Sequence, residues 1–155
     1  FLPMLSDYKN LVILRTLSKI GFAGLRVGFM IADREIINEV NKVRLPFNLN
    51  SISQAVAAAL IKNPNTIKLH IGLITSERER LLNELWGIKG IKPYPSEANF
   101  ILFRTKNSDK IYYRLLKKGV LVRNMKGAVN GCLRVTIGTK KENNIFIKAL
   151  KEVMK

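Results

Sequence analysis

A lysine and an arginine lie seven residues apart in a glycine-rich segment near the start of the chain, at Lys19 and Arg26. One apolar run precedes Lys19 and a second apolar run surrounds and follows Arg26. Continuous apolar runs of this length are typical of strands that are buried on both faces of a sheet. We therefore expect strands over 11–17 and 25–32, continuing a parallel sheet, with Lys19 in the turn after the first strand.

A lysine amine attacks carbonyl groups when a neighbouring cation or partial desolvation keeps it unprotonated. Arg26 could supply such a cation. The Ser18 hydroxyl, the amides of the turn and the Arg26 guanidinium could together hold a phosphate group. This combination suits a cofactor that carries both an aldehyde and a phosphate. The alternative is that Lys19 is an ordinary surface lysine of a glycine-rich turn.

Two further arginines are candidates for binding an anion. Arg134 lies inside an apolar segment, where a cation is costly unless an anion meets it. Arg123 follows the apolar run 120–122 and offers the same planar, forked set of donors. The residues leave alternatives open: a solvent-exposed strand end for Arg123, and for Arg134 an internal salt bridge with Glu97 or Glu142.

The segment Thr-Leu-Ser-Lys at 16–19, followed by Ala-Gly-Leu-Arg-Val-Gly at 23–28, resembles the lysine segment of the fold-type I aminotransferases that use pyridoxal phosphate. The resemblance is closest to the histidinol-phosphate aminotransferases. Later blocks resemble that family in the same order, at 42–48 with Ser53 and Gln54, 95–100, 119–123 and 133–139. The implied fold class is α/β, in which this chain supplies the end of the large-domain parallel sheet, a linking helix and a small α+β domain.

The resemblance also implies a role for each candidate residue. Lys19 would bind pyridoxal 5'-phosphate covalently and act as general acid and base on the substrate, while Ser18 and Arg26 would hold the cofactor phosphate. Arg123 and Arg134 match family arginines that bind the phosphate ester of the substrate. The implied reaction is amino transfer between L-histidinol phosphate and 2-oxoglutarate in histidine biosynthesis, in a cytoplasmic homodimer.

The chain has 155 residues and begins at Phe1, whereas the family's lysine lies past the middle of a much longer chain. The resemblance therefore implies a C-terminal fragment that lacks the other half of the cofactor site and could be inactive alone. The alternatives are threonine-phosphate decarboxylase, another class I or II aminotransferase, and a noncatalytic basic binding module.

The composition limits the other classes of function. A formal net charge of +16 suits a nucleic-acid surface, an anionic ligand or a lost acidic partner. The cations are spread along the chain without a helix-turn-helix or zinc-finger pattern, so we expect no specific nucleic acid. We expect no metal and no membrane span, because ligand spacings and long apolar runs are absent. The single cysteine, Cys132, is expected to be buried, and His70 to be a partly packed or solvated helical residue.

Periodicity divides the chain into a large-domain segment at 1–48, connecting helices at 49–86 and a small domain at 87–155. We expect a helix from Asp33 that ends at Pro46, a second helix with a capping box formed by Ser51 and Gln54, and a third from Pro64 to about Trp86.

In the small domain the pattern predicts short strands and two helices, with the helices on one face of the sheet. Thr139 and Glu142 are expected to form a capping box. The predicted strands are 91–94, 99–104, 120–122 and 133–137, and the predicted helices are 108–118 and 140–154.

Overall fold

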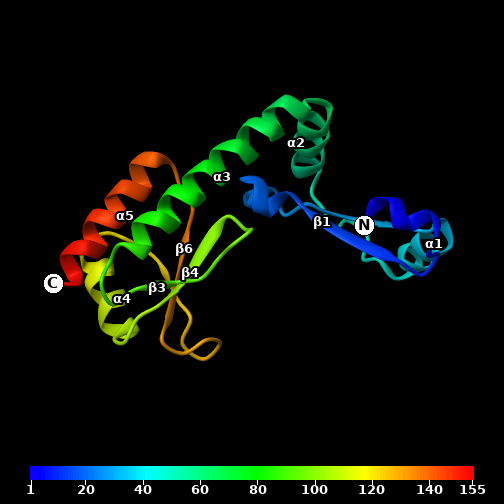
Figure 1. Ribbon diagram of the computed structural model, residues 1–155. Coiled ribbons are helices and arrows are strands. Elements are labelled where there is room, and N and C mark those ends of the chain that lie inside the picture. The colour runs from blue at the N-terminus through cyan, green and yellow to red at the C-terminus, as the bar shows by residue number, and fades with distance from the viewer. The chain divides into compact units, whose positions relative to one another are not determined.

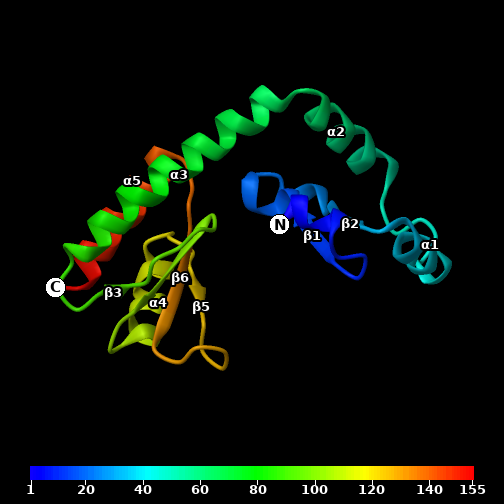
Figure 2. The ribbon, with the colours of Figure 1, turned by 45° about the vertical axis from the view of Figure 1, so that its right-hand side comes forward.

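A β-hairpin carries the segment around Lys19. The computed structural model describes all residues, 1–155. Strands β1 (Val12–Thr16) and β2 (Gly28–Ala32) pair antiparallel, with Val12 opposite Ala32 and Thr16 opposite Gly28. Figure 2 shows the two strands side by side. The chain forms two compact units, a first unit of Phe1–His70 and a second unit of Ile71–Lys155.

The antiparallel pairing corrects the expectation that these two strands continue a parallel sheet. The link between them, residues 17–27, contains only the short 3-10 helices η2 (Leu17–Ile20) and η3 (Ala23–Leu25). Parallel neighbours need a longer crossover connection, usually with an α-helix. The expectation that the first strand is buried on both faces is also wrong, because Leu14 of β1 is 74% exposed.

The first unit also contains η1 (Leu2–Ser6), the helices α1 (Arg34–Val43) and α2 (Ser51–Lys62), and the start of a third helix. Asp33 caps α1 as expected, accepting a hydrogen bond from the backbone amide of Glu35. The cap of α2 was predicted wrongly. Asn50 is its N-cap and accepts from the amide of Ser53, while the Gln54 side chain reaches back to the carbonyl of Leu49.

Helix α3 (Pro64–Trp86) begins and ends where the sequence predicted, with proline in its first turn. The boundary between the two compact units falls within this helix, at residues 70 and 71. The three-part division at 48 and 86 stays a prediction. None of the helices is both long and apolar enough to cross a membrane.

The second unit is built on a four-stranded antiparallel sheet in the order β3-β4-β6-β5. Helices α4 (Ser108–Lys117) and α5 (Lys140–Val153) lie on one side of it, as predicted (Figure 1). Thr139 and Glu142 form the expected capping box of α5. The strands are β3 (Lys92–Pro93), β4 (Phe100–Arg104), β5 (Arg123–Asn124) and β6 (Cys132–Thr136).

Side-chain alternation sorts the two central strands into a buried and an open face. Ile101 and Phe103 of β4 and Leu133 and Val135 of β6 are buried in a core with residues of all three helices of this unit. Cys132 is also fully buried, as expected. The residues between the core positions, including Arg134, therefore face away from the helices.

The strand predicted at 120–122 was wrong, because β5 begins only at Arg123. Gly119 adopts a positive φ of 73°, and the amide of Val120 bonds back to the carbonyl of Leu115. The residues directly after α4 therefore cap the C-terminus of that helix, and pairing with β6 begins only after them. Val122 is nevertheless buried.

Candidate functional site

Lys19 lies in η2, directly after the carboxyl end of β1. Leu17 anchors this turn, since it is buried in the small core of the first unit with Val27 and Ala57. The Thr16 hydroxyl oxygen accepts from the amide of Ser18 at 3.1 Å, and Gly21 ends the turn with a left-handed φ of 98°. The Lys19 side chain is exposed.

Arg26 lies at the same end of the hairpin as Lys19, because Thr16 pairs with Gly28. Its backbone is left-handed, with φ 57° and ψ 30°. A residue other than glycine meets steric strain in this region. Strained positions of this kind gather at functional sites. The structure therefore brings Ser18, Lys19 and Arg26 together at one edge, while their roles stay predictions.

These three side chains offer an amine, a hydroxyl and a guanidinium. That set suits an aldehyde that can condense with the amine and a phosphate that can accept from the other two groups. No group of three or more His, Cys, Asp or Glu side chains lies close enough together to hold a metal ion.

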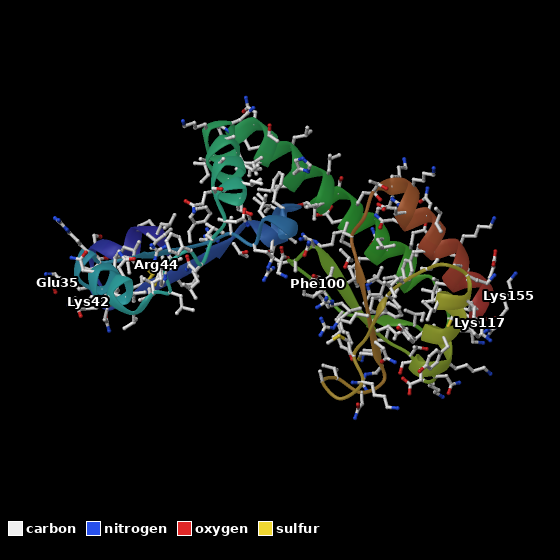
Figure 3. The ribbon with its side chains drawn as sticks, turned by 180° about the vertical axis from the view of Figure 1, so that it is seen from behind. Glu35, Lys42, Arg44, Phe100, Lys117 and Lys155 are labelled. Carbon is white, nitrogen blue, oxygen red and sulfur yellow. The ribbon has the colours of Figure 1, made fainter.

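Arg134 projects from the open face of β6 in the second unit. Its guanidinium carbon lies 4.7 Å from the centre of the Phe100 ring, a cation–π arrangement (Figure 3 labels Phe100 at the start of β4). Its Nε atom is buried and has no hydrogen-bond partner. A buried unpaired donor is costly, so this atom is suited to an acceptor from outside the chain.

The predicted alternative, an internal salt bridge of Arg134, is contradicted. Glu97 pairs instead with Arg78 at 3.4 Å, and the Glu142 carboxylate is bound by Thr139 in the capping box. The Thr139 hydroxyl and amide lower the pKa of Glu142.

Arg123 lies directly opposite Arg134, in the register of β5 and β6. The neighbouring residue, Asn124, holds β5 to α4, because its amide donates to Asp109 at 2.6 Å. This bond and the Lys126 ammonium keep the pKa of Asp109 below its ordinary value. Asp109 therefore stays ionised and helps to fix the strand that carries Arg123.

A hollow of about 450 Å³ lies beside the two arginines. It has no carboxylate in its lining, so its charge is positive. The two guanidiniums and this lining suit an anionic ligand, but Arg123 is exposed at the first residue of β5, so the alternative of a solvent-exposed strand end stays open for it. The lining residues are Tyr112, Leu121, Val122, Arg123, Asn124, Arg134 and Thr136.

Three residues around Arg134 were missed by the sequence reasoning. Thr136 could have been found from strand alternation, which places it two residues from Arg134 on the same face. Phe100 lies under the guanidinium, and Tyr112 reaches the hollow from α4. No signal within the sequence indicates these last two contacts, since they depend on how β4 and α4 pack around β6.

Comparison with known proteins supplies the family. Residues 2–150 match the model of the family described as aminotransferase class I and II. A histidinol-phosphate aminotransferase from Vesicomyosocius okutanii is 44% identical over 154 residues, which are 98% of this chain and 44% of that protein. One from Pyrococcus furiosus is 46% identical over 155 residues, with 99% of this chain and 44% of that protein covered.

Solved structures agree with this assignment. The histidinol-phosphate aminotransferase from Clostridium acetobutylicum superposes with a TM-score of 0.88 at 30% identity, covering 99% of this chain and 48% of that one. The histidinol-phosphate aminotransferase from Sinorhizobium meliloti, in complex with pyridoxal-5'-phosphate, superposes with a TM-score of 0.82 at 26% identity. The match covers 96% of this chain and 42% of that one. An L-threonine-O-3-phosphate decarboxylase from Porphyromonas gingivalis superposes with a TM-score of 0.78 at 25% identity. The match covers 96% of this chain and 49% of that one.

The chain thus spans less than half the length of the relatives that it matches. Its fold agrees with theirs over almost all of its own length. The family model covers both compact units, from the hairpin to α5. The chain belongs to the aminotransferase class I and II family.

Proposed function

We propose that this chain is part of a histidinol-phosphate aminotransferase, which transfers an amino group between L-histidinol phosphate and 2-oxoglutarate. The observation that carries the proposal is the pair of guanidiniums, Arg123 and Arg134, beside a hollow without carboxylates. Two adjacent forked cations suit the double negative charge of a phosphate ester better than a single carboxylate. Relatives of this name at 44–46% identity support the same substrate.

We propose further that Lys19, Ser18 and Arg26 hold pyridoxal phosphate. When bound, this cofactor supplies an aldehyde that condenses with amines and a ring that accepts electrons from the substrate. Lys19 would bond to the aldehyde carbon through Nζ, and the Ser18 hydroxyl and Arg26 guanidinium would donate to the phosphate. The set of donors at the end of β1 and the relative in complex with this cofactor support this assignment.

Lys19 would have a second task when the substrate is bound. Its amine would act as the general base and acid that moves a proton at the substrate carbon that bears the nitrogen. The exposed position of Lys19 in η2 suits this role, because its amine is accessible to a substrate. Arg123 and Arg134 would meanwhile hold the phosphate end of the substrate and fix its orientation.

The competing function is decarboxylation of threonine phosphate, whose substrate also carries a phosphate ester. The solved structures differ little here, since the decarboxylase is 25% identical and the aminotransferases from Sinorhizobium meliloti and Clostridium acetobutylicum are 26% and 30% identical, but sequence relatives at 44–46% identity are named histidinol-phosphate aminotransferase. The names of these sequence relatives favour amino transfer. We also propose a cytoplasmic homodimer as the working form, on the resemblance to the family alone.

The test is an assay of the chain together with a complementary polypeptide that carries the part of the relatives it does not span. With pyridoxal phosphate and 2-oxoglutarate added, glutamate should form from L-histidinol phosphate. Release of carbon dioxide from threonine phosphate, without glutamate formation from histidinol phosphate, would overturn the proposal in favour of the decarboxylase. A reconstituted protein that binds the cofactor but acts on neither substrate would contradict both.

A further inference from the structure

The hollow beside Arg123 and Arg134 contains more hydrogen-bonding groups than the two arginines. Three other polar side chains line it, from Tyr112, Asn124 and Thr136. Asn124 is already used by the fold, since its amide donates to Asp109 and its oxygen accepts from the amide of Lys126. The two hydroxyls, by contrast, are not bonded within the chain.

Thr136 is placed by the alternation of β6. It lies two residues beyond Arg134 and therefore on the same, open face of the strand. Across the sheet it pairs with Phe100, the residue whose ring lies against the Arg134 guanidinium. The Thr136 side chain is exposed, so its hydroxyl is available to a ligand that Arg134 holds.

Tyr112 reaches the hollow from a different element, α4. Its ring is half-buried and packs against the core of the second unit, which limits how far the side chain can move. A tyrosine held in this way presents a hydroxyl at a fixed place, with little entropy lost when a ligand binds. The next residue, Tyr113, is 60% exposed and does not line the hollow.

We infer that Tyr112 and Thr136 are two further substrate-binding residues, whose hydroxyls donate to the phosphate ester held by Arg123 and Arg134. This inference rests on the proposed function. A phosphate ester has three unesterified oxygens arranged as a tetrahedron, whereas a carboxylate has two in a plane. Donors on β5, β6 and α4 surround the hollow from several directions, so the hydroxyls select for the phosphate over a carboxylate.

The experiment is a titration of the 155-residue chain with inorganic phosphate and, separately, with acetate, followed by NMR. The Nε–H signals of Arg123 and Arg134 report on the anion directly. Tyr112→Phe and Thr136→Val each remove one hydroxyl with little change of shape. Each should weaken phosphate binding about fivefold, the effect of losing one hydrogen bond, and leave acetate binding unchanged.

Controls separate this inference from the proposed function. Tyr113→Phe should bind phosphate as the unsubstituted chain does, and Thr136→Ser should keep most of the affinity. If Arg134→Ala loses phosphate binding while Tyr112→Phe and Thr136→Val keep it, the hydroxyls have no role and the arginine site stands. If Arg123→Ala and Arg134→Ala bind phosphate unchanged, or the unsubstituted chain does not bind it, the arginine site itself is contradicted along with the inference.

Discussion

Arg123 and Arg134 lie directly opposite each other on the neighbouring strands β5 and β6. Like charges in this position repel each other and destabilise the pair. Neither guanidinium belongs to an ion pair within the chain. A doubly charged anion between them would remove the repulsion and give the buried Nε of Arg134 an acceptor. The arrangement is therefore better suited to the bound state than to the free one.

Arg134→Lys should weaken phosphate binding although it keeps the positive charge. Lysine loses the forked geometry and cannot replace the buried Nε donor, so the loss should be about 1–3 kcal/mol. Isothermal titration with inorganic phosphate measures it. An unchanged affinity would show that Arg134 acts as a point charge only. Arg78→Lys is the matched control, because Arg78 is a largely buried arginine that pairs with the exposed Glu97, and this variant should bind phosphate normally.

Arg123→Ala should discriminate between kinds of anion. The second guanidinium is needed where the ligand carries the extra charge of a phosphate, so phosphate binding should fall by tenfold or more, about 1.4 kcal/mol, while acetate binding changes little. Competition between the two anions, read from the Arg134 Nε–H signal, checks this. Equal losses for phosphate and acetate would make Arg123 a general electrostatic contributor and remove the argument for a phosphate ester.

Arg26→Gly should separate stability from binding. Glycine adopts the left-handed backbone of residue 26 without strain, so the folded chain should be as stable as before or more stable by up to about 1 kcal/mol. Binding of pyridoxal phosphate should nevertheless weaken, because a phosphate donor is lost. Urea unfolding and the absorbance of the bound cofactor give the two quantities. Arg15→Gly, within β1, is the control and should destabilise the hairpin. Unchanged cofactor affinity in Arg26→Gly would remove Arg26 from the proposed site.

Glu77 makes the second unit sensitive to acid. Its carboxylate accepts two hydrogen bonds from Arg80 and one from Asn143, which itself bonds to Gly138 at the turn before α5. The Arg80 guanidinium is the main reason why the pKa of Glu77 falls from 4.5 to about 2. Because the pKa of Glu77 is lower in the folded state than in the unfolded state, its ionised carboxylate stabilises the folded state above pH 4.5. This stabilisation is lost as the pH falls towards 2 and the carboxylate is protonated. It amounts to at most about 3 kcal/mol.

Glu77→Gln should therefore lower the free energy of unfolding at pH 7 and have little effect near pH 2. Urea unfolding followed by the fluorescence of Trp86, the single tryptophan, at the end of α3, measures both. Glu97→Gln is the control, because that carboxylate is 98% exposed in its pair with Arg78. A loss in Glu77→Gln that stays constant from pH 7 to pH 2 would show that the ionised carboxylate is not responsible.

Local sequence signals predicted the elements that depend on local physics. Pro64 at the start of α3 and the pair Thr139 and Glu142 at the start of α5 place those helices, since caps involve residues only a few positions apart. The direction of β2 relative to β1 could not be read from an apolar run, because such a run carries no information on its partner. The start of β5 was missed for a similar reason, since the hydrogen bond from Val120 to Leu115 competes with strand pairing.

The residues of the candidate site that lie within short motifs were also predictable from the sequence. Lys19 and Arg26 were found from a short motif, and their common position follows from the hairpin that joins them. Arg134 stood out as a cation in an apolar strand. The positions of Tyr112 and Phe100 beside Arg134 depend on packing between distant segments, α4 and β4 against β6, and only the structure reveals that packing.

The central claim, that Lys19 is the amine that binds the cofactor, is tested most directly by covalent trapping. The chain is mixed with one equivalent of pyridoxal phosphate, reduced with borohydride and digested, and the modified lysines are identified by mass spectrometry. Modification should be concentrated on Lys19, and Lys19→Arg, which keeps the charge but cannot condense, should lose it. Modification spread evenly over the other lysines, with Lys19 no higher than the exposed Lys42, would contradict the account.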